Sequence, residues 1–188
     1  MKMNIVQPIR DKEKLEQMKF ELKKNGTRDY MLFYVGINTG LRVSDIVKLK
    51  VSDVKNANGT MKEYVTIVEK KTSKTKKFPI YNGLLAELTK YTSDMEQDQY
   101  LFPSQKGVNQ HITEVQAYRI LNKAGKNIGL EEIGTHSMRK TFGYHHYQQN
   151  KDVALLQEIF NHSAPIITLR YIGINQDIID SSLRSFAL

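Results

Sequence analysis

Hydrophobic residues recur at helical spacing over much of the chain. Residues 12–24 gather their apolar side chains on one stripe, and Asp11 before them can cap the first turn. Residues 28–38 are apolar on most sides, which predicts a helix buried in the core. The same spacing predicts further helices over residues 41–49, 82–93, 113–127, 152–160 and 163–170, and one that begins at about residue 135.

Two short segments have a β pattern instead. Residues 63–69 are rich in β-branched and aromatic side chains, and residues 76–80 supply a return strand. With the helices, they predict a mainly α fold with a small antiparallel β-sheet, of the α+β class. No internal repeat or low-complexity linker interrupts the chain, so residues 1–188 are expected to form a single domain.

The net charge of the chain indicates which classes of partner it binds. The 28 Lys and Arg against 20 Asp and Glu give a formal net charge of +8, which favours nucleic acid first and an anionic membrane surface second. The absence of cysteine excludes disulfides, thiolate catalysis and cysteine-ligated zinc. The sequence has neither a run of roughly eighteen apolar residues nor a signal-peptide core, so a cytoplasmic protein without a membrane anchor is expected.

Five lysines lie within residues 70–77, in and beside the turn of the predicted hairpin. Such a run is usually a solvated turn, but in a basic protein it is equally suited to reach into a groove and contact phosphates. Lys70, Lys74 and Lys76 are therefore candidate DNA-binding residues. Lysine, unlike arginine, can also give up its proton.

The last third of the chain gathers the residue types of a reaction centre. His136 and Arg139 are three apart, so on a helix they point to one side, and Thr135 is a candidate cap for that helix. His162 follows the next predicted helix, and Tyr171 comes nine residues later. A tyrosine hydroxyl beside two histidines and an arginine is what covalent attack on a phosphodiester requires.

Each of these side chains has a chemical part in such an attack. Arg42 and Arg139 can clamp the developing negative charge with paired donors, and Asp45 can orient Arg42. A tyrosine, with a reference pKa of about 10, needs a base. His136 is the candidate base, whereas His162 suits a donor to a phosphate oxygen. A hairpin lysine can protonate the departing 5′-oxygen. Because a phosphotyrosine ester conserves the bond energy, no ATP, metal or other cofactor is expected.

A metal site is the weaker alternative for the same histidines. The histidines of the last third form no HExxH pattern, and no carboxylate stands at a recognised ligand spacing. His145 and His146 are adjacent and point in different directions on a helix, which is typical of ordinary helix residues. No metal site is therefore expected.

Four segments of the chain, in this order, resemble the boxes of the tyrosine recombinase (phage integrase) catalytic domain. They are Thr39-Gly40-Leu41-Arg42-Val43-Ser44-Asp45, the lysine hairpin, His136-Ser137-Met138-Arg139, and the run from Asn161-His162-Ser163 to Tyr171. The resemblance spans nearly the whole chain and implies the fold of that catalytic domain. It also implies a catalytic set with Asp45 in support, namely Arg42, Lys71, His136, Arg139, His162 and Tyr171.

Two positions of this resemblance need comment. Lys71 is the implied hairpin lysine because it stands eight residues before Pro79, and Lys74 remains a rival. Asn161 stands where the family usually has glycine, and asparagine tolerates the left-handed conformation that glycine adopts there.

The resemblance further implies a function. The chain would be the catalytic domain of a site-specific DNA recombinase or integrase, which cleaves double-stranded DNA at an attachment site through a 3′-phosphotyrosine. It would serve the integration or excision of a bacterial or phage mobile element and associate with the nucleoid when bound to DNA. Four protomers would act together on DNA by exchanging a helix at residues 176–188. The core-binding and arm-binding domains of full family members are absent from residues 1–188, which favours a piece of a longer integrase over a natural short form.

Three alternatives remain open. A type IB topoisomerase shares the chemistry but religates the same strand. A non-catalytic DNA-binding protein would use the basic hairpin and leave Tyr171 with a structural role. A regulator would compete with a full-length recombinase through residues 176–188.

Overall fold

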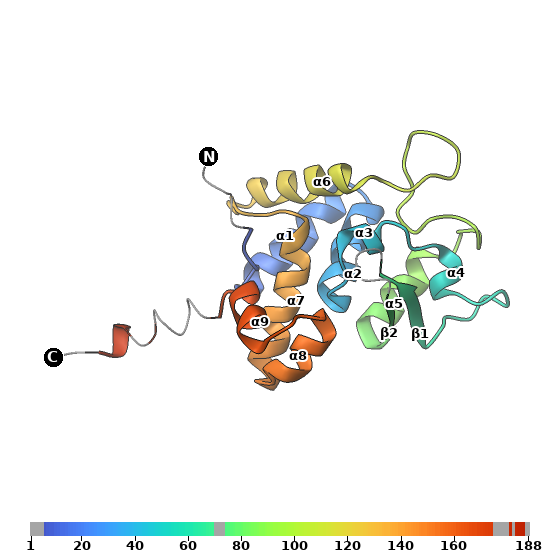
Figure 1. The fold of residues 1–188 in the computed structure, drawn as a ribbon. Helices are drawn as coiled ribbons and strands as arrows, with labels where there is room; N and C mark the ends of the chain where they lie inside the picture. The colour runs from blue at the N-terminus through green and yellow to red at the C-terminus, as the bar shows by residue number, and fades with distance from the viewer. Residues whose placement is uncertain (1–5, 70–73, 175–180, 182, 187–188) are drawn as a thin grey trace.

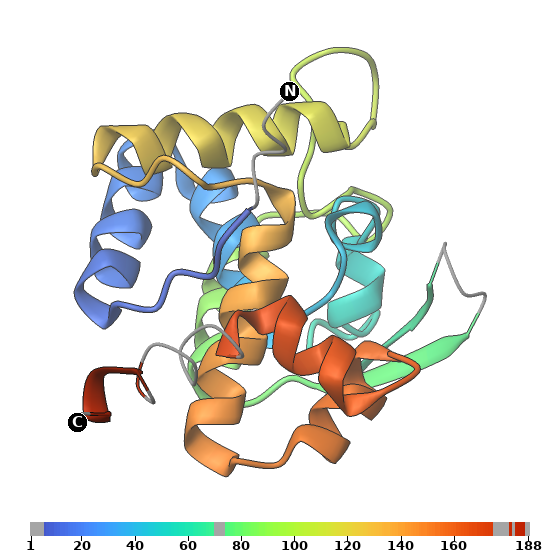
Figure 2. The ribbon, with the colours of Figure 1, turned by 60° about the vertical axis from the view of Figure 1, so that its left-hand side comes forward.

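Helices α2 (Thr27–Thr39) and α7 (Thr135–Asn150) pack against each other at the centre of the fold (Figure 1). The computed structural model describes residues 6–69, 74–174, 181 and 183–186. Helices α1 (Lys12–Lys24) and α6 (Glu114–Asn127) lie on one side of this pair. Figure 2 shows α6 crossing near the start of α7, α9 lying across the middle of α7, and α8 following its far end.

The remaining elements surround this centre. They are α3 (Val43–Ile46), α4 (Val51–Val54), α5 (Asn82–Tyr91), α8 (Val153–Phe160), α9 (Pro165–Ile172), β1 (Tyr64–Val68) and β2 (Thr75–Pro79). Strands β1 and β2 pair antiparallel, with Val65 opposite Phe78. The predicted fold class, mainly helical with a small antiparallel sheet, is confirmed.

Side-chain caps start several of the predicted helices, and the cap at Asp11 was itself predicted. The carboxylate of Asp11 accepts the Glu13 amide of α1 at 2.7 Å, and that of Asp152 accepts the Leu155 amide of α8 at 2.9 Å. Each cap satisfies an amide that has no partner inside its own helix. Asp11 therefore sets where α1 begins, and Asp152 sets where α8 begins after α7.

Two local predictions were wrong. Thr135 does not cap α7, because Gly134 occupies the cap position and its amide donates to the Ser137 hydroxyl at 3.2 Å. A Cβ on Gly134 would come within 3.2 Å of Val6, so this close approach favours glycine. The helix predicted over residues 41–49 is shorter, because the chain leaves it to pair with a later segment, where the Leu101 amide donates to the Leu49 carbonyl at 2.8 Å.

The apolar core has two parts. The larger cluster is built around α2, whose Met31, Leu32 and Phe33 are fully buried, as predicted for this helix. The smaller cluster joins α7, α8 and α9 through buried side chains that include Phe160 and Ile172. Full burial of such a side chain contributes about 1.5–3 kcal/mol, so a few residues hold the last two helices against the rest of the fold.

The C-terminal segment predicted to mediate self-association is only partly described. Leu183 and Phe186 are each 67% exposed, and most of residues 176–188 lies outside the described residues. Across the part of the chain that the structure describes, no helix is both long and apolar enough to cross a membrane.

Candidate active site

Arg42 enters the site from the short connection between α2 and α3. Helix α2 ends at Gly40, which has a left-handed conformation (φ 63°) and lies so close to Phe142 that a Cβ there would collide with the ring. The chain then becomes extended at Arg42, the residue before α3. Arg42 Nη1 donates a hydrogen bond of 2.7 Å to Glu69 Oε1. The guanidinium is thus held by a carboxylate from the β-hairpin.

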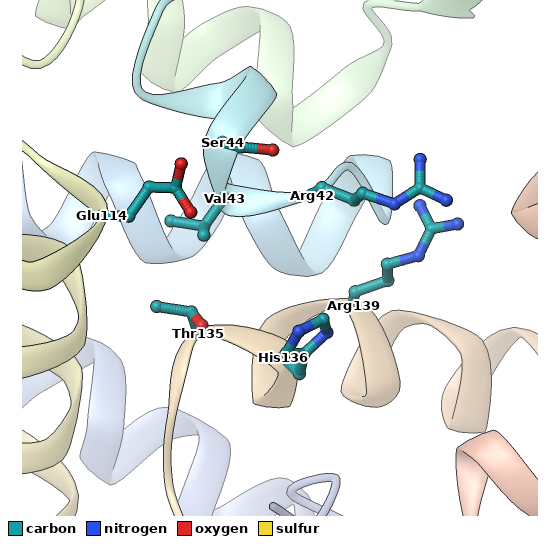
Figure 3. Close-up of a pocket in the computed structure, with 7 residues that line it drawn as sticks. All are labelled: Arg42, Val43, Ser44, Glu114, Thr135, His136 and Arg139. Carbon is teal, nitrogen blue, oxygen red and sulfur yellow. The ribbon is translucent and has the colours of Figure 1, made fainter. Parts of the chain in front are cut away.

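His136 and Arg139 lie on the first turns of α7 and line the same cavity, as their spacing predicted (Figure 3). Arg139 is 3% exposed, and its guanidinium donates to the carbonyl oxygens of Gly40 and, at 2.9 Å, Phe160. Its Cζ lies 4.3 Å from the centre of the Phe160 ring, a cation–π contact. Arg139 is therefore fixed on several sides, whereas His136 is exposed.

A left-handed residue turns the chain into His162. Asn161 ends α8 with φ 54° and ψ 47°, so asparagine provides the conformation that the sequence predicted for this position. The His162 amide donates to the Gln157 carbonyl at 3.0 Å, and its Nδ1 lies 2.9 Å from the hydroxyl oxygen of Thr168. Thr168 is fully buried, so this bond fixes the orientation of the imidazole.

Tyr171 lies near the end of α9. Pro165 begins this helix, as is common at a first helical position, and the left-handed Gly173 ends it. The Tyr171 hydroxyl oxygen lies 3.2 Å from His136 Nδ1, and the centres of the Tyr171 and His162 rings are 5.2 Å apart. The fold thus brings together residues 35 positions apart along the chain.

Burial sets the protonation of the site at neutral pH. Burial raises the pKa of Tyr171, and the charges of Arg139 and Arg42 oppose this only in part. Burial lowers the pKa of His162, and the cations Arg139, Arg42 and Lys76 lower it further. Tyr171 is therefore a neutral hydroxyl, and His162 is a neutral imidazole.

The lysines of the hairpin fall into two groups. Lys70 and Lys71 lie outside the described residues, so their predicted roles stay predictions. Lys74 Nζ donates to Asn161 Oδ1 at 2.7 Å, at the edge of the site. Lys76 points inward with a side chain that is 20% exposed, and burial lowers its pKa while the Arg139 charge lowers it further.

Two residues of the site were not predicted from the sequence. Glu69 is fully buried and contacts both Arg42 and Lys76 Nζ, the latter at 3.2 Å. Its one signal in the sequence is an acidic residue directly before a lysine run. Thr168 contacts His162 but resembles any helical threonine, so no sequence signal marks it.

Asp45 is a buried carboxylate whose charge acts on an arginine of the site. It is 7% exposed on α3, and its negative charge supports the charged form of Arg139 by raising the pKa of that guanidinium, which burial lowers. Arg42 contacts the carboxylate of Glu69. The prediction that Asp45 orients Arg42 stays a prediction.

The cavity next to these residues has a volume of about 450 Å³. The guanidinium groups of Arg42 and Arg139 lie side by side at one edge, and Glu114 and Thr135 lie toward the other (Figure 3). The lining residues are Arg42, Val43, Ser44, Glu114, Thr135, His136 and Arg139. Among the residues that the structure describes, no three His, Asp or Glu side chains gather so that they could hold a metal ion. Paired guanidinium groups beside a hydroxyl are suited to an anionic, phosphate-like ligand.

The sequence has relatives over nearly its full length. The profile of the phage integrase family matches residues 9–177. A probable integrase/recombinase of Bacillus subtilis, YoeC, is 49% identical over 184 residues, which is 98% of each chain. The tyrosine recombinase XerA of Pyrococcus furiosus is 27% identical over 161 residues, which is 85% of this chain and 54% of its own. The chain therefore matches nearly all of YoeC and about half of XerA.

Solved structures share the fold at low sequence identity. The crystal structure of XerA recombinase superimposes with a TM-score of 0.74 and 20% identity, covering 97% of this chain and 67% of that one. A lambda integrase dimer bound to a COC′ core site gives a TM-score of 0.68 and 17% identity, covering 88% of this chain and 47% of that one. The chain thus shares its arrangement of helices and strands with these two structures.

Proposed function

The chain belongs to the phage integrase family of tyrosine recombinases, and on that premise we propose that it cleaves and rejoins DNA through Tyr171. The predicted family, fold and enzyme class, a tyrosine-type site-specific recombinase, are confirmed. The observation that carries the proposal is the Tyr171 hydroxyl, 3.2 Å from an exposed histidine nitrogen and beside the buried Arg139. A nucleophile, a base and an anion clamp then occupy one site.

Cleavage is a transfer of one phosphoryl group. The Tyr171 oxygen forms a bond to phosphorus, the bond from phosphorus to the 5′-oxygen breaks, and a 3′-phosphotyrosine remains. His136 Nδ1 takes the hydroxyl proton, and a hairpin lysine gives a proton to the 5′-oxygen. Lys71 is the proposed donor, with Lys74 as its rival. Attack by the 5′-hydroxyl of a partner strand reverses these steps and joins the exchanged end, without any change in the number of ester bonds.

Three side chains would stabilise the charge that develops on the non-bridging oxygens. Arg42 and Arg139 supply guanidinium donors that stay ionised at any working pH. The Thr168 hydroxyl, if it donates to His162 Nδ1, leaves the ring proton on Nε2, which can then donate to the phosphate. This assignment supports the predicted role of His162 as a donor, and the 3.2 Å between the Tyr171 hydroxyl oxygen and His136 Nδ1 supports His136 as the base.

Double-stranded DNA at an attachment site is the proposed substrate. The net charge of +8 supports an anionic partner, and a related structure is that of XerH bound to palindromic difH substrate in a post-cleavage complex. We propose integration or excision of a mobile element as the role, with association to the nucleoid through DNA. Self-association as a tetramer through residues 176–188 is supported by the exposed Leu183 and Phe186.

A nicked suicide duplex that carries the attachment site of the mobile element tests the proposal. The nick releases a short product, so a covalent protein–DNA adduct accumulates and can be seen on a denaturing gel in the presence of EDTA. We expect an adduct with the wild-type chain and with Tyr147→Phe, and none with Tyr171→Phe. A Tyr171→Phe variant that forms the same adduct would contradict the proposal. Strand exchange between two duplexes separates recombination from religation of a single strand by a topoisomerase.

A further inference from the structure

Glu69 brings a buried negative charge into a cationic site. Its side chain is 0% exposed, and its Oε1 lies 2.7 Å from Arg42 Nη1 and 3.2 Å from Lys76 Nζ. A carboxylate is almost never fully buried unless it is paired, because losing its hydration is costly. The pairing here is with two cations that lie beside the proposed phosphate site.

The carboxylate connects three parts of the fold. Glu69 follows β1, and its amide donates to the Lys74 carbonyl at 3.0 Å, which extends the hairpin pairing by one bond. Lys76, on β2, also donates to the Ile159 carbonyl at the end of α8, close before His162. Arg42 comes from the connection after α2. One buried anion thus locates the hairpin relative to an arginine of the clamp and to the helix that leads to His162.

The charge of Glu69 also offsets repulsion within the site. Arg42 and Arg139 place their guanidinium groups side by side (Figure 3), and like charges at such a separation repel. Glu69 favours the charged forms of both Lys76 and Arg139 by raising their pKa values against the effect of burial. Without this anion, Arg42 and Lys76 would lose their shared partner, and the repulsion among the cations of the site would be offset less.

We propose that Glu69 is a positioning residue for strand cleavage. It holds Arg42 by Nη1, so that other donors of the five-donor guanidinium face the phosphate, and it anchors the base of the lysine hairpin through Lys76. Glu69 does not touch the DNA itself. This inference rests on the proposed function, since the positioned groups are those that act on the scissile phosphate.

Kinetics of the variants separate positioning from binding. Glu69→Gln keeps the shape and removes the charge, Glu69→Asp keeps the charge, and Glu63→Gln is the control, because Glu63 is an exposed carboxylate directly before β1. At saturating suicide duplex, Glu69→Gln should form the adduct about 3- to 10-fold more slowly, because its amide oxygen still accepts a hydrogen bond from Arg42 but lacks the charge that roughly doubles the strength of that bond. Its affinity for DNA should not fall, because removing a negative charge reduces the repulsion between the protein and the DNA phosphates. Glu69→Asp should be faster than Glu69→Gln, and Glu63→Gln should match wild type.

A measurement without DNA tests the positioning itself. Nitrogen-15 relaxation at Arg42 Nε, assigned with Arg42→Lys, should show an ordered side chain in wild type and in Glu63→Gln, and a mobile one in Glu69→Gln. An Arg42 side chain that stays ordered in Glu69→Gln would overturn the inference, as would a wild-type rate of adduct formation in that variant. The inference would also be overturned if weaker DNA binding explained the slower adduct formation. The same holds if Glu69→Asp slowed adduct formation as much as Glu69→Gln does. If wild type forms no adduct, the proposed function fails, and the relaxation result still decides the role of Glu69.

Discussion

A methyl group added at Gly143 should disable the site more than it destabilises the fold. Gly143 is buried on α7 where this helix meets α8 and α9. A Cβ there would lie 2.7 Å from Ile172 Cγ2 and 2.7 Å from two ring carbons of Phe160. Because carbon atoms pack at about 3.5–4.0 Å, the last two helices must move away from α7 by about 1 Å. Tyr171 lies directly before Ile172 and its ring packs against Phe160, with ring centres 5.6 Å apart.

The two effects of Gly143→Ala differ in size. Alanine is better than glycine inside a helix by about 1 kcal/mol, and overpacking a core costs about 1–3 kcal/mol. The net loss of unfolding free energy should therefore be about 0–2 kcal/mol. A nucleophile misplaced by about 1 Å can cost about 100-fold in rate. The variant should stay folded and cleave DNA about 10- to 100-fold more slowly.

Urea unfolding and the rate of adduct formation on the suicide duplex measure these two quantities. The control is Gln149→Ala, an exposed position on the same helix, which should leave the rate of adduct formation unchanged. A Gly143→Ala variant that is more stable by about 1 kcal/mol and cleaves at the wild-type rate would refute the reasoning. It would show that the added methyl group is accommodated without moving α9.

Other substitutions test neighbouring parts of the site. Thr168→Val removes the hydroxyl beside His162 Nδ1 and should lower the free energy of unfolding, measured in urea, by about 1–2 kcal/mol. It should slow adduct formation about tenfold, and an unchanged rate would remove Thr168 from the site. Because burial lowers the pKa of His162, the unfolded chain binds more protons as the pH falls below about 6.5, so stability falls in acid. In His162→Gln, the midpoint of urea unfolding should change less than in wild type between about pH 7.5 and 5.5. A midpoint that changes with pH as much as in wild type would contradict this. Lys71→Ala should slow cleavage of an ordinary phosphodiester but not of a 5′-bridging phosphorothiolate, whose thiolate leaves without a proton. If Lys74→Ala shows that pattern instead, Lys74 is the donor.

Elements with strong periodicity and clear end signals could be predicted closely from the sequence. Asp11 and residues 12–24 carry both an apolar stripe and a cap, and α1 has those bounds. The apolar segment at 28–38 became the buried α2, extended by one residue at each end. The left-handed conformation of Asn161 was expected from the resemblance, because Asn161 stands where the family usually has glycine and asparagine tolerates that conformation.

Features that depend on distant contacts could not be predicted. Thr135 has the side chain of a cap, but Gly134 occupies the cap position, where a Cβ would come within 3.2 Å of Val6. His136 and Arg139 share a helical side in the sequence pattern, yet one is exposed and the other buried, because only Arg139 lies under Phe160. Glu69 has its role only because the hairpin folds back onto Arg42, and spacing along the chain does not encode that distance.

The residue that becomes linked to DNA is the most direct test of the proposed chemistry. The adduct would be trapped with a 5′-bridging phosphorothiolate duplex, digested with nuclease and protease, and sequenced by mass spectrometry. We predict a nucleotide 3′-phosphate on Tyr171, its absence from Tyr171→Phe, and its retention in Tyr147→Phe. Linkage to Tyr144, Tyr147 or any other side chain, or an adduct that persists in Tyr171→Phe, would contradict the assignment of Tyr171 as the nucleophile.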